Sequence, residues 1–159
     1  TENKGPGKWR LWQDDPLGTC ALWWRWQVGL GDRDGGALPP GLYHQLRYED
    51  LVTDPPQELG KIASFLELPY SESMANYHSG KTRRQSGLSA KAAWLPPVQG
   101  LRDWREEMSP EDVGVFEGIA GDMLTRFGYE CLERRPNAAV ARRVSRCLQW
   151  WDREGGDRR

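Results

Sequence analysis

The sequence has little of what marks metal sites, disulfide frameworks or membrane spans. It contains only three cysteines and two histidines, and they show no metal-ligand spacing. We therefore expect no metal site, and we expect all three cysteines to be free thiols in the core or on the surface. No apolar run approaches the ~20 residues that a transmembrane helix needs. No signal peptide is recognisable either, and the chain starts at Thr1 rather than Met. The sparse, odd number of cysteines fits a reducing compartment, so we expect a cytoplasmic protein, with no membrane segment in this chain.

The chain also lacks an excess of charge of either sign. It carries 22 basic and 23 acidic residues, a formal net charge of -1 over 159 residues. A nucleic-acid-binding domain usually carries a strong positive charge, so we expect no nucleic-acid partner. What the chain has in quantity is tryptophan, with nine residues, which predicts an aromatic core.

The first half of the chain predicts a helix, a loop, a strand and a second helix. Apolar residues recur at helical spacing over residues 17–30, and a loop rich in glycine and proline follows over residues 31–41. Alternating apolar residues predict a strand over residues 42–48. Asp54 and Pro55 then form a typical helix start, which predicts a helix that ends near Pro69.

The second half predicts two more helices after an irregular stretch over residues 80–103. Ser109 begins a helix that is expected to end at Gly128. A last, amphipathic and basic helix is predicted over residues 137–151, with Val140, Val144, Leu148 and Trp151 inside and Arg142, Arg143 and Arg146 outside. We expect it to dock on its own domain, although docking on a partner is the alternative.

Two segments in this order resemble one known family. The first is Arg47-Tyr48-Glu49-Asp50-Leu51 with the helix after it, and the second is Arg102-Asp103-Trp104-Arg105 with the helix that ends in Phe127-Gly128-Tyr129. This pattern is similar to the C-terminal half of sulfotransferases that use 3'-phosphoadenosine-5'-phosphosulfate (PAPS), and closest to the bacterial branch. The resemblance spans about residues 17–130.

The resemblance implies a fold, a domain division and a set of nucleotide-binding residues. The fold is the C-terminal part of a P-loop-like α/β sulfotransferase, mostly helical with one or few parallel strands. Residues 1–130 form the sulfotransferase portion, and residues 131–159 form the basic tail helix. The implied ligands of PAPS, or of its product PAP, are Tyr48, Gly100, Trp104 and Arg105. Tyr48 is expected to contact the adenosine, and Arg105 offers a planar fork of donors to a phosphate.

Parts that sulfuryl transfer needs are missing from the sequence. The family places a phosphosulfate-binding loop, a general base and an Arg-Ser pair in its N-terminal half, and none of these is found here. We therefore interpret the chain as a fragment, assign no residue to catalysis, and expect the isolated chain to be inactive. The acceptor would be a small molecule or a glycan.

Two other functions remain open at this point. The chain is either a non-catalytic, Trp-rich helical module that binds a protein, or part of another P-loop transferase such as a small-molecule kinase. A fragment with one unpaired strand is also expected to be weakly stable or to self-associate, because an isolated strand leaves its backbone groups unpaired. A homo-oligomer is therefore possible.

Overall fold

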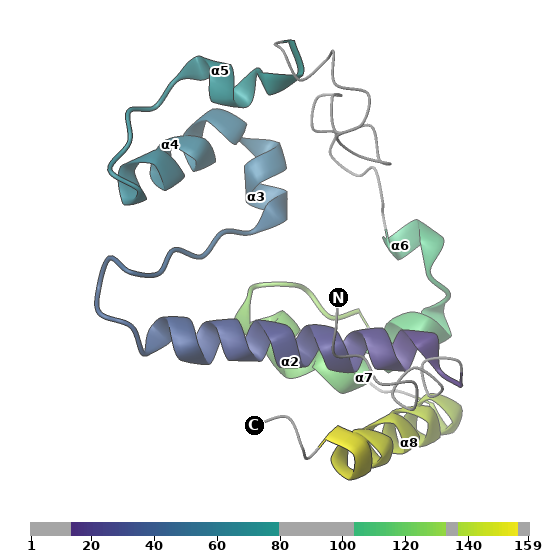
Figure 1. The fold of residues 1–159 in the computed structure, drawn as a ribbon. Coiled ribbons are helices and arrows are strands. Elements are labelled where there is room, and N and C mark those ends of the chain that lie inside the picture. Colours follow the sequence, from purple (N-terminus) through teal and green to yellow (C-terminus); the bar gives the residue numbers. More distant parts are fainter. Residues whose placement is uncertain (1–13, 80–103, 133–136, 156–159) are drawn as a thin grey trace. The chain divides into compact units, whose positions relative to one another are not determined.

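The computed structural model describes residues 14–79, 104–132 and 137–155, and the elements in these ranges are helical (Figure 1). The chain divides into two compact units. Thr1–Gly36 and Trp104–Arg159 form the first, which we call the α2–α7–α8 unit, and Ala37–Asp103 form the second, the central unit. The elements are α2 (Pro16–Gly36), α3 (Tyr48–Thr53), α4 (Pro55–Phe65), α5 (Glu72–Ala75), the 3-10 turn η2 (Tyr77–Ser79), α6 (Trp104–Glu107), α7 (Pro110–Arg126) and α8 (Ala138–Gly155).

In the α2–α7–α8 unit, α2 and α7 lie side by side and run in the same direction. Arg25 of α2 pairs with Asp122 of α7 at 2.7 Å. Further towards the C-terminal end of both helices, Asp32 of α2 pairs with Arg126 of α7, also at 2.7 Å. Trp24 packs on Phe116 with ring centroids 5.8 Å apart. Two parallel helices cannot be joined by a short turn, and residues 37–103 provide the long connection.

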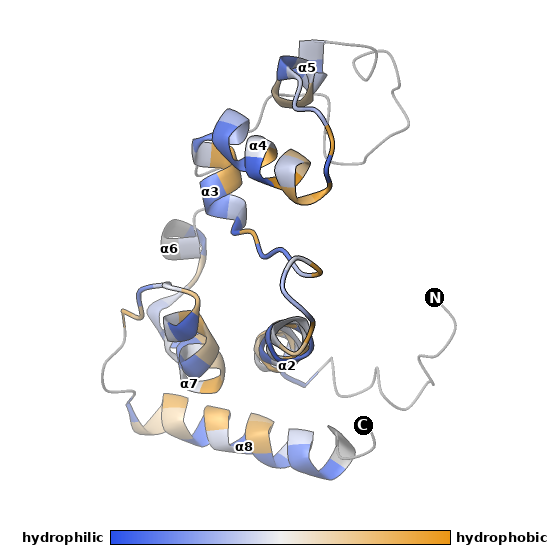
Figure 2. Cartoon of the chain, turned by 90° about the vertical axis from the view of Figure 1, so that its left-hand side faces the viewer, coloured by the Kyte–Doolittle hydropathy of each residue, from blue (hydrophilic) through white to orange (hydrophobic). Residues whose placement is uncertain are grey.

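Helix α8 covers both α2 and α7, so the tail helix docks on its own chain as expected. Its apolar positions, orange in Figure 2, recur along the helix. Buried residues from all three helices form the core of this unit: Ala21, Leu22, Val115, Ile119, Val140 and Cys147. The helix was predicted over residues 137–151 and is observed over Ala138–Gly155.

The helices approach one another closely at two glycines. A Cβ atom built on Gly18 of α2 would lie 2.4 Å from the Cys147 sulfur of α8. A Cβ built on Gly118 of α7 would lie 2.7 Å from a methyl group of Val144. Both distances are far inside van der Waals contact, so α8 can reach its place only because these positions carry no side chain.

The helix boundaries agree with several sequence signals. The Asp54 side chain accepts a hydrogen bond from the Gln57 N–H, and Ser109 does the same for Asp112. Gly128 has a φ of 73° and directly follows the last turn of α7, where a left-handed residue closes the helix. The boundary predicted at residue 30 is wrong, because α2 continues to Gly36 through the charged residues that were interpreted as loop.

The strand predicted over residues 42–48 is also wrong for the described part of the chain. Residues 43–47 are neither helix nor turn, and Arg47 is extended, with φ -90° and ψ 136°. No other described segment pairs with them, and Tyr48 already belongs to α3. Glu49 and Asp50 lie in the first turn of α3, where carboxylates favour a helix start. The alternation thus predicted an extended backbone correctly but not a sheet.

In the described part of the central unit, residues 37–79, helices α3, α4 and α5 pack in sequence, and few residues are buried. Its extended segment packs on α4, where the His44 and Phe65 rings lie 5.3 Å apart. Ten large hydrophobic residues in the described part of the chain are exposed, and nine of them belong to this unit. They are Leu38, Leu42, Tyr43, Tyr48, Leu66, Leu68, Tyr70, Met74 and Tyr77.

Candidate functional site

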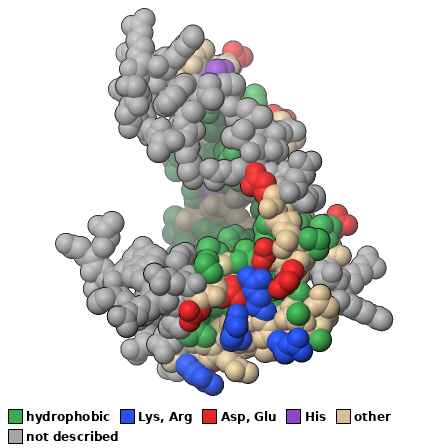
Figure 3. Space-filling view, turned by 90° about the vertical axis from the view of Figure 1, so that its right-hand side faces the viewer, with side chains coloured by type: hydrophobic (Ala, Val, Ile, Leu, Met, Phe, Trp, Pro, Cys, Tyr) green, Lys and Arg blue, Asp and Glu red, His purple; other side chains and the backbone are tan. Residues whose placement is uncertain are grey.

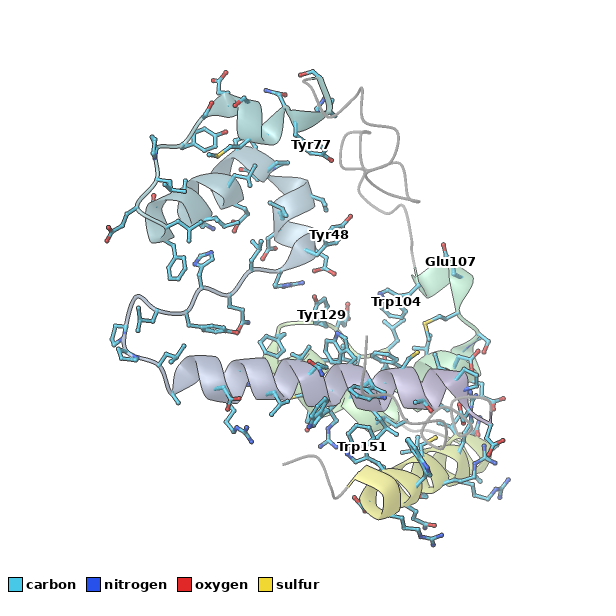
Figure 4. The ribbon with its side chains drawn as sticks, in the orientation of Figure 1. Tyr48, Tyr77, Trp104, Glu107, Tyr129 and Trp151 are labelled. Carbon is cyan, nitrogen blue, oxygen red and sulfur yellow. The ribbon has the colours of Figure 1, made fainter. Side chains whose placement is uncertain are left out.

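Tyr48, the expected adenosine contact, is the first residue of α3 and lies on the surface of the central unit. Its side chain is 65% exposed, more than that of any other large hydrophobic residue described (Figure 4). Tyr48 was expected at the end of a strand, and the structure instead places it at the start of a helix. An exposed aromatic face at a helix start is nevertheless a surface on which a nucleotide base can stack.

The electrostatics around Tyr48 favour the base of a nucleotide over its phosphates. Glu49 and Asp50 follow directly, and Glu49 lies 3.9 Å from the Arg47 guanidinium. Two carboxylates within two residues would repel a phosphate more strongly than one arginine attracts it. Tyr48 is thus suited to contact adenine, and any phosphate requires positive groups from elsewhere in the chain.

Trp104, the second described candidate, is the first residue of α6 and belongs to the α2–α7–α8 unit. Its side chain is half-buried. The backbone of Arg105 is helical, but its side chain lies outside the described residues, as do Gly100 and the basic run over residues 81–84. The structure therefore gives positions for Tyr48 and Trp104 in two separate units.

The described arginines of the α2–α7–α8 unit mostly hold helices together. Arg25, Arg126 and Arg143 each bind a carboxylate of another helix or its cap. Acidic and basic side chains accordingly lie against one another on this unit (Figure 3). A guanidinium already bound to a carboxylate is a poor phosphate ligand, so these three arginines are unsuited to bind a phosphate.

The strongest polar cluster is one that the sequence analysis missed. Asp15 precedes α2 and is 8% exposed, and its carboxylate accepts two hydrogen bonds from Arg143 of α8, at 2.8 and 2.9 Å. It also accepts the Gly18 N–H at 3.0 Å, which caps the helix. Arg143 reaches Asp112 of α7 at 2.9 Å as well. The prediction that Arg143 points outward is wrong, because it joins the starts of α2 and α7 to α8.

This cluster changes the acid–base properties of two buried groups. The Arg143 guanidinium holds the pKa of the Asp15 carboxyl well below its usual range. Burial, with the Asp15 carboxylate 3.5 Å away, raises the pKa of the Cys147 thiol to about 11. Such a thiol is a poor nucleophile at neutral pH. The cluster therefore stabilises the packing of α8, and the Asp15-Pro16 pair was the sequence signal for it, as Asp54-Pro55 was for α4.

The histidines show no catalytic arrangement in the structure. His44 packs on Phe65 and His78 on Tyr77, at 5.3 and 5.6 Å between ring centroids. Among the described residues, no cluster of histidine, cysteine and carboxylate side chains has the arrangement of a metal site. Within the same residues no helix is long and apolar enough to span a bilayer.

Comparison with known proteins identifies the kind of protein that this sequence resembles. A model of the sulfotransferase family matches residues 5–72. The chain is also 26% identical, over 104 residues, to carbohydrate sulfotransferase 1 of Danio rerio. The resemblance to the sulfotransferase family is confirmed. The alignment takes in 62% of this chain and 25% of the relative, so this chain spans a minor part of that protein's length.

The sulfotransferase-like segment, residues 5–72, contains Tyr48 and the helix starts on either side of it. It includes α2, the extended residues before α3, and α4 with its Asp54 cap. Trp104 and Arg105 lie beyond this segment, and the assignment of Tyr48, Trp104 and Arg105 to the nucleotide stays a prediction. No solved structure matches the chain significantly.

Proposed function

We propose that this chain contributes the adenosine-binding part of a sulfotransferase that transfers a sulfuryl group from PAPS to a hydroxyl or amine of its acceptor. The observation that carries the proposal is the family match over residues 5–72, which contains the exposed ring of Tyr48. Because the matched relative is named as a carbohydrate sulfotransferase, we propose a carbohydrate hydroxyl as the acceptor group.

In the proposed reaction the acceptor oxygen attacks the sulfur of PAPS in line with the bond to the leaving phosphate. The new oxygen–sulfur bond forms as the old one breaks, PAP leaves with the bond electrons, and the acceptor proton passes to a general base. Such transfers depend mainly on positioning and on stabilising charge that spreads over the oxygens. The sequence offers no residue for the base, so this chain's role is to hold the nucleotide.

The resemblance and the charge around Tyr48 suggest how the roles are divided. Tyr48, beside two carboxylates, holds the adenine, while Arg105 and the backbone at Gly100 bind the 3'-phosphate. Trp104, half-buried at the start of α6, anchors the segment that carries Arg105. These roles rest on the resemblance, and each can be tested separately.

Binding of PAP to the purified chain, measured by isothermal titration calorimetry, tests this proposal. Tyr48→Ala removes the stacking ring and should weaken binding by roughly tenfold, which corresponds to ~1.4 kcal/mol. Tyr70→Ala is the matched control, because Tyr70 is also an exposed tyrosine of the central unit but lies outside the signature segment of residues 47–51. Arg105→Ala should weaken PAP binding at least as much.

Three results would contradict the proposal. One is the absence of PAP binding by a folded chain, and another is an equal loss of affinity in the Tyr70 control. The third is tighter binding of ATP with Mg²⁺ than of PAP, which would favour the kinase alternative, since kinases bind their nucleotide through metal-bridged phosphates.

A further inference from the structure

The outer face of α8 carries a straight row of arginines, which we call the arginine row: Arg142, Arg146 and Arg153. At about 3.6 residues per turn, their positions lie within about 40° of one another around the helix axis. All three residues are exposed, and the side chain of Arg146 is 70% exposed. Gln149, which is also exposed, lies in the same row. With a rise of about 1.5 Å per residue, the row is about 17 Å long.

The carboxylates that approach α8 lie to one side of the arginine row. Arg143 is one residue on from Arg142 and therefore about 100° away around the helix, and it faces the starts of α2 and α7. Its guanidinium lies 2.8, 3.6 and 2.9 Å from the carboxylates there, which are Asp15, Glu111 and Asp112. Arg146 reaches the edge of this cluster, 3.4 Å from Asp15. Asp152, one residue before Arg153, is displaced from the row by a similar angle.

The positive charge of the tail is local. Residues 131–159 contain eight arginines and four acidic residues, a formal net charge of +4, whereas the whole chain carries -1. Such a segment attracts an anion over roughly a Debye length, ~10 Å at 0.1 M salt, without making the whole protein basic. A single row of guanidinium groups on one helix is therefore suited to a thin, linear polyanion.

Two common anionic partners fit this face poorly. A helix that binds a membrane surface buries its apolar face among the lipids. The apolar residues of α8 are instead packed in the core with α2 and α7, among them Val140, Val144, Cys147 and Leu148. Proteins that bind nucleic acid neutralise many phosphates with a strongly basic surface, and this chain has a net charge of -1.

We infer that the arginine row of α8 binds the sulfated part of a linear glycan. A sulfate ester is an anion whose oxygens match the planar fork of a guanidinium, as phosphate oxygens do. The inference rests on the proposed carbohydrate acceptor, because repeated transfer along one glycan makes that glycan a linear polyanion. Sulfates added earlier would then hold the glycan on α8 while further hydroxyls react.

Titration calorimetry of the chain with chondroitin sulfate oligosaccharides, and with the same oligosaccharides after chemical desulfation, tests the inference. The sulfated form should bind, and its affinity should fall as NaCl is raised from about 50 to about 200 mM, because binding of a polyanion releases its counterions. The desulfated form should bind about tenfold more weakly or not at all.

A double variant tests whether the arginine row is the binding surface. Arg142→Gln with Arg153→Gln removes two charges of the row and keeps Arg146. It should weaken binding of the sulfated oligosaccharides by about tenfold, the effect of losing two exposed ion pairs. The matched control is Arg33→Gln with Lys61→Gln, which changes the net charge equally at side chains that are 71% and 53% exposed and lie outside α8. The control should lose less than about threefold, because salt screens charges that do not touch the ligand.

The inference is overturned by a folded chain, checked by circular dichroism, that does not bind the sulfated oligosaccharides. Equal affinity for the desulfated form, or equal losses in the two double variants, overturns it as well. Tighter binding of duplex DNA, or of vesicles that contain phosphatidylserine, would overturn it by assigning the row to another class of partner.

PAP binding, measured on the same samples, separates this inference from the proposed function. A chain that binds PAP but not the sulfated oligosaccharides contradicts the inference alone. A chain that binds the sulfated oligosaccharides through the arginine row but not PAP supports the inference and contradicts the nucleotide-binding role.

Discussion

At the scale of single residues, Asp15 links several groups of the described structure. It caps α2, pairs through two hydrogen bonds with Arg143, and lies beside the Cys147 thiol. The Arg143 side chain is 23% exposed and that of Asp15 is 9% exposed, so water screens this pair less than a surface pair. Loss of one partner leaves the other charged and poorly solvated.

We predict that Asp15→Asn lowers the free energy of unfolding at pH 7 by about 3 kcal/mol, the lower end for breaking a buried pair. Because the pKa of Asp15 is lowered in the folded chain, its ionised form stabilises the fold above the unfolded value of ~3.9. That contribution is lost as the pH falls through the folded-state pKa. The difference between the two chains should therefore shrink below about pH 4, as measured by urea denaturation.

Asp122→Asn is the matched control for this prediction. Asp122 also pairs with an arginine of another helix, but the side chains of Asp122 and Arg25 are 54% and 42% exposed. An exposed pair contributes less than about 1 kcal/mol. Equal losses of stability in the two variants, or a loss from Asp15→Asn that does not depend on pH, would contradict the role given to Asp15.

Single residues also show that local contacts could be predicted from the sequence, whereas contacts between distant residues could not. The caps Asp54 and Ser109 and the left-handed Gly128 were predicted because each acts on neighbours within three or four residues. The inward direction of Arg143 was not, because its partner Asp15 lies 128 residues away in the chain. A periodic pattern gives no sign of a polar contact over such a separation.

At the scale of the helices, close packing rather than propensity fixes where α8 lies. Gly18 lies inside α2, where glycine costs up to ~1 kcal/mol relative to alanine. Its use is explained by the Cys147 sulfur, which occupies the space of a Cβ. At Gly29, further along the same helix, a Cβ would be 4.0 Å from its nearest neighbour, the Met123 terminal methyl.

We therefore predict opposite effects for two identical substitutions in α2. Gly18→Ala should lower the free energy of unfolding by about 1–3 kcal/mol through overpacking against α8. Gly29→Ala should raise it by up to ~1 kcal/mol, since alanine favours the helix and nothing has to move. Thermal unfolding followed by circular dichroism measures both. A stabilising Gly18→Ala would show that α8 does not approach α2 as described.

Tryptophan illustrates what composition alone conveys about the elements. Nine tryptophans predicted an aromatic core, and the structure places Trp151 of α8 against Trp23 and Trp26 of α2 at 6.1 and 6.3 Å between ring centroids (Figure 4). These rings pack edge to face and remain half-buried, while the fully buried positions belong to small residues such as Ala21, Val115 and Ala120. Short side chains let three helices converge, which a residue count does not indicate.

At the scale of the whole molecule, the helices were largely predictable and the sheet was not. A helix satisfies its own backbone groups, so local signals suffice to place α4, α7 and α8. A strand depends on another segment for its hydrogen bonds. The alternation over residues 42–48 therefore predicted an extended backbone with one packed face, but it could not predict whether another strand pairs with it. The division into residues 1–130 and 131–159 stays a prediction, as does the cytoplasmic compartment.

The candidate site was predicted from a resemblance, and the structure adds exposure and charge at Tyr48. The ring is exposed, and two carboxylates follow it in the first turn of α3. The proposed contacts of Tyr48 with the adenine and of Arg105 with the 3'-phosphate stay predictions.

The most direct test is a calorimetric comparison of PAP with adenosine 5'-phosphate, which lacks the 3'-phosphate. The account predicts that the chain binds PAP and binds adenosine 5'-phosphate at least tenfold more weakly, and that Arg105→Ala abolishes this preference while Tyr48→Ala weakens both ligands alike. Equal affinity for the two nucleotides, or binding of neither, would contradict the nucleotide-binding role proposed for this chain.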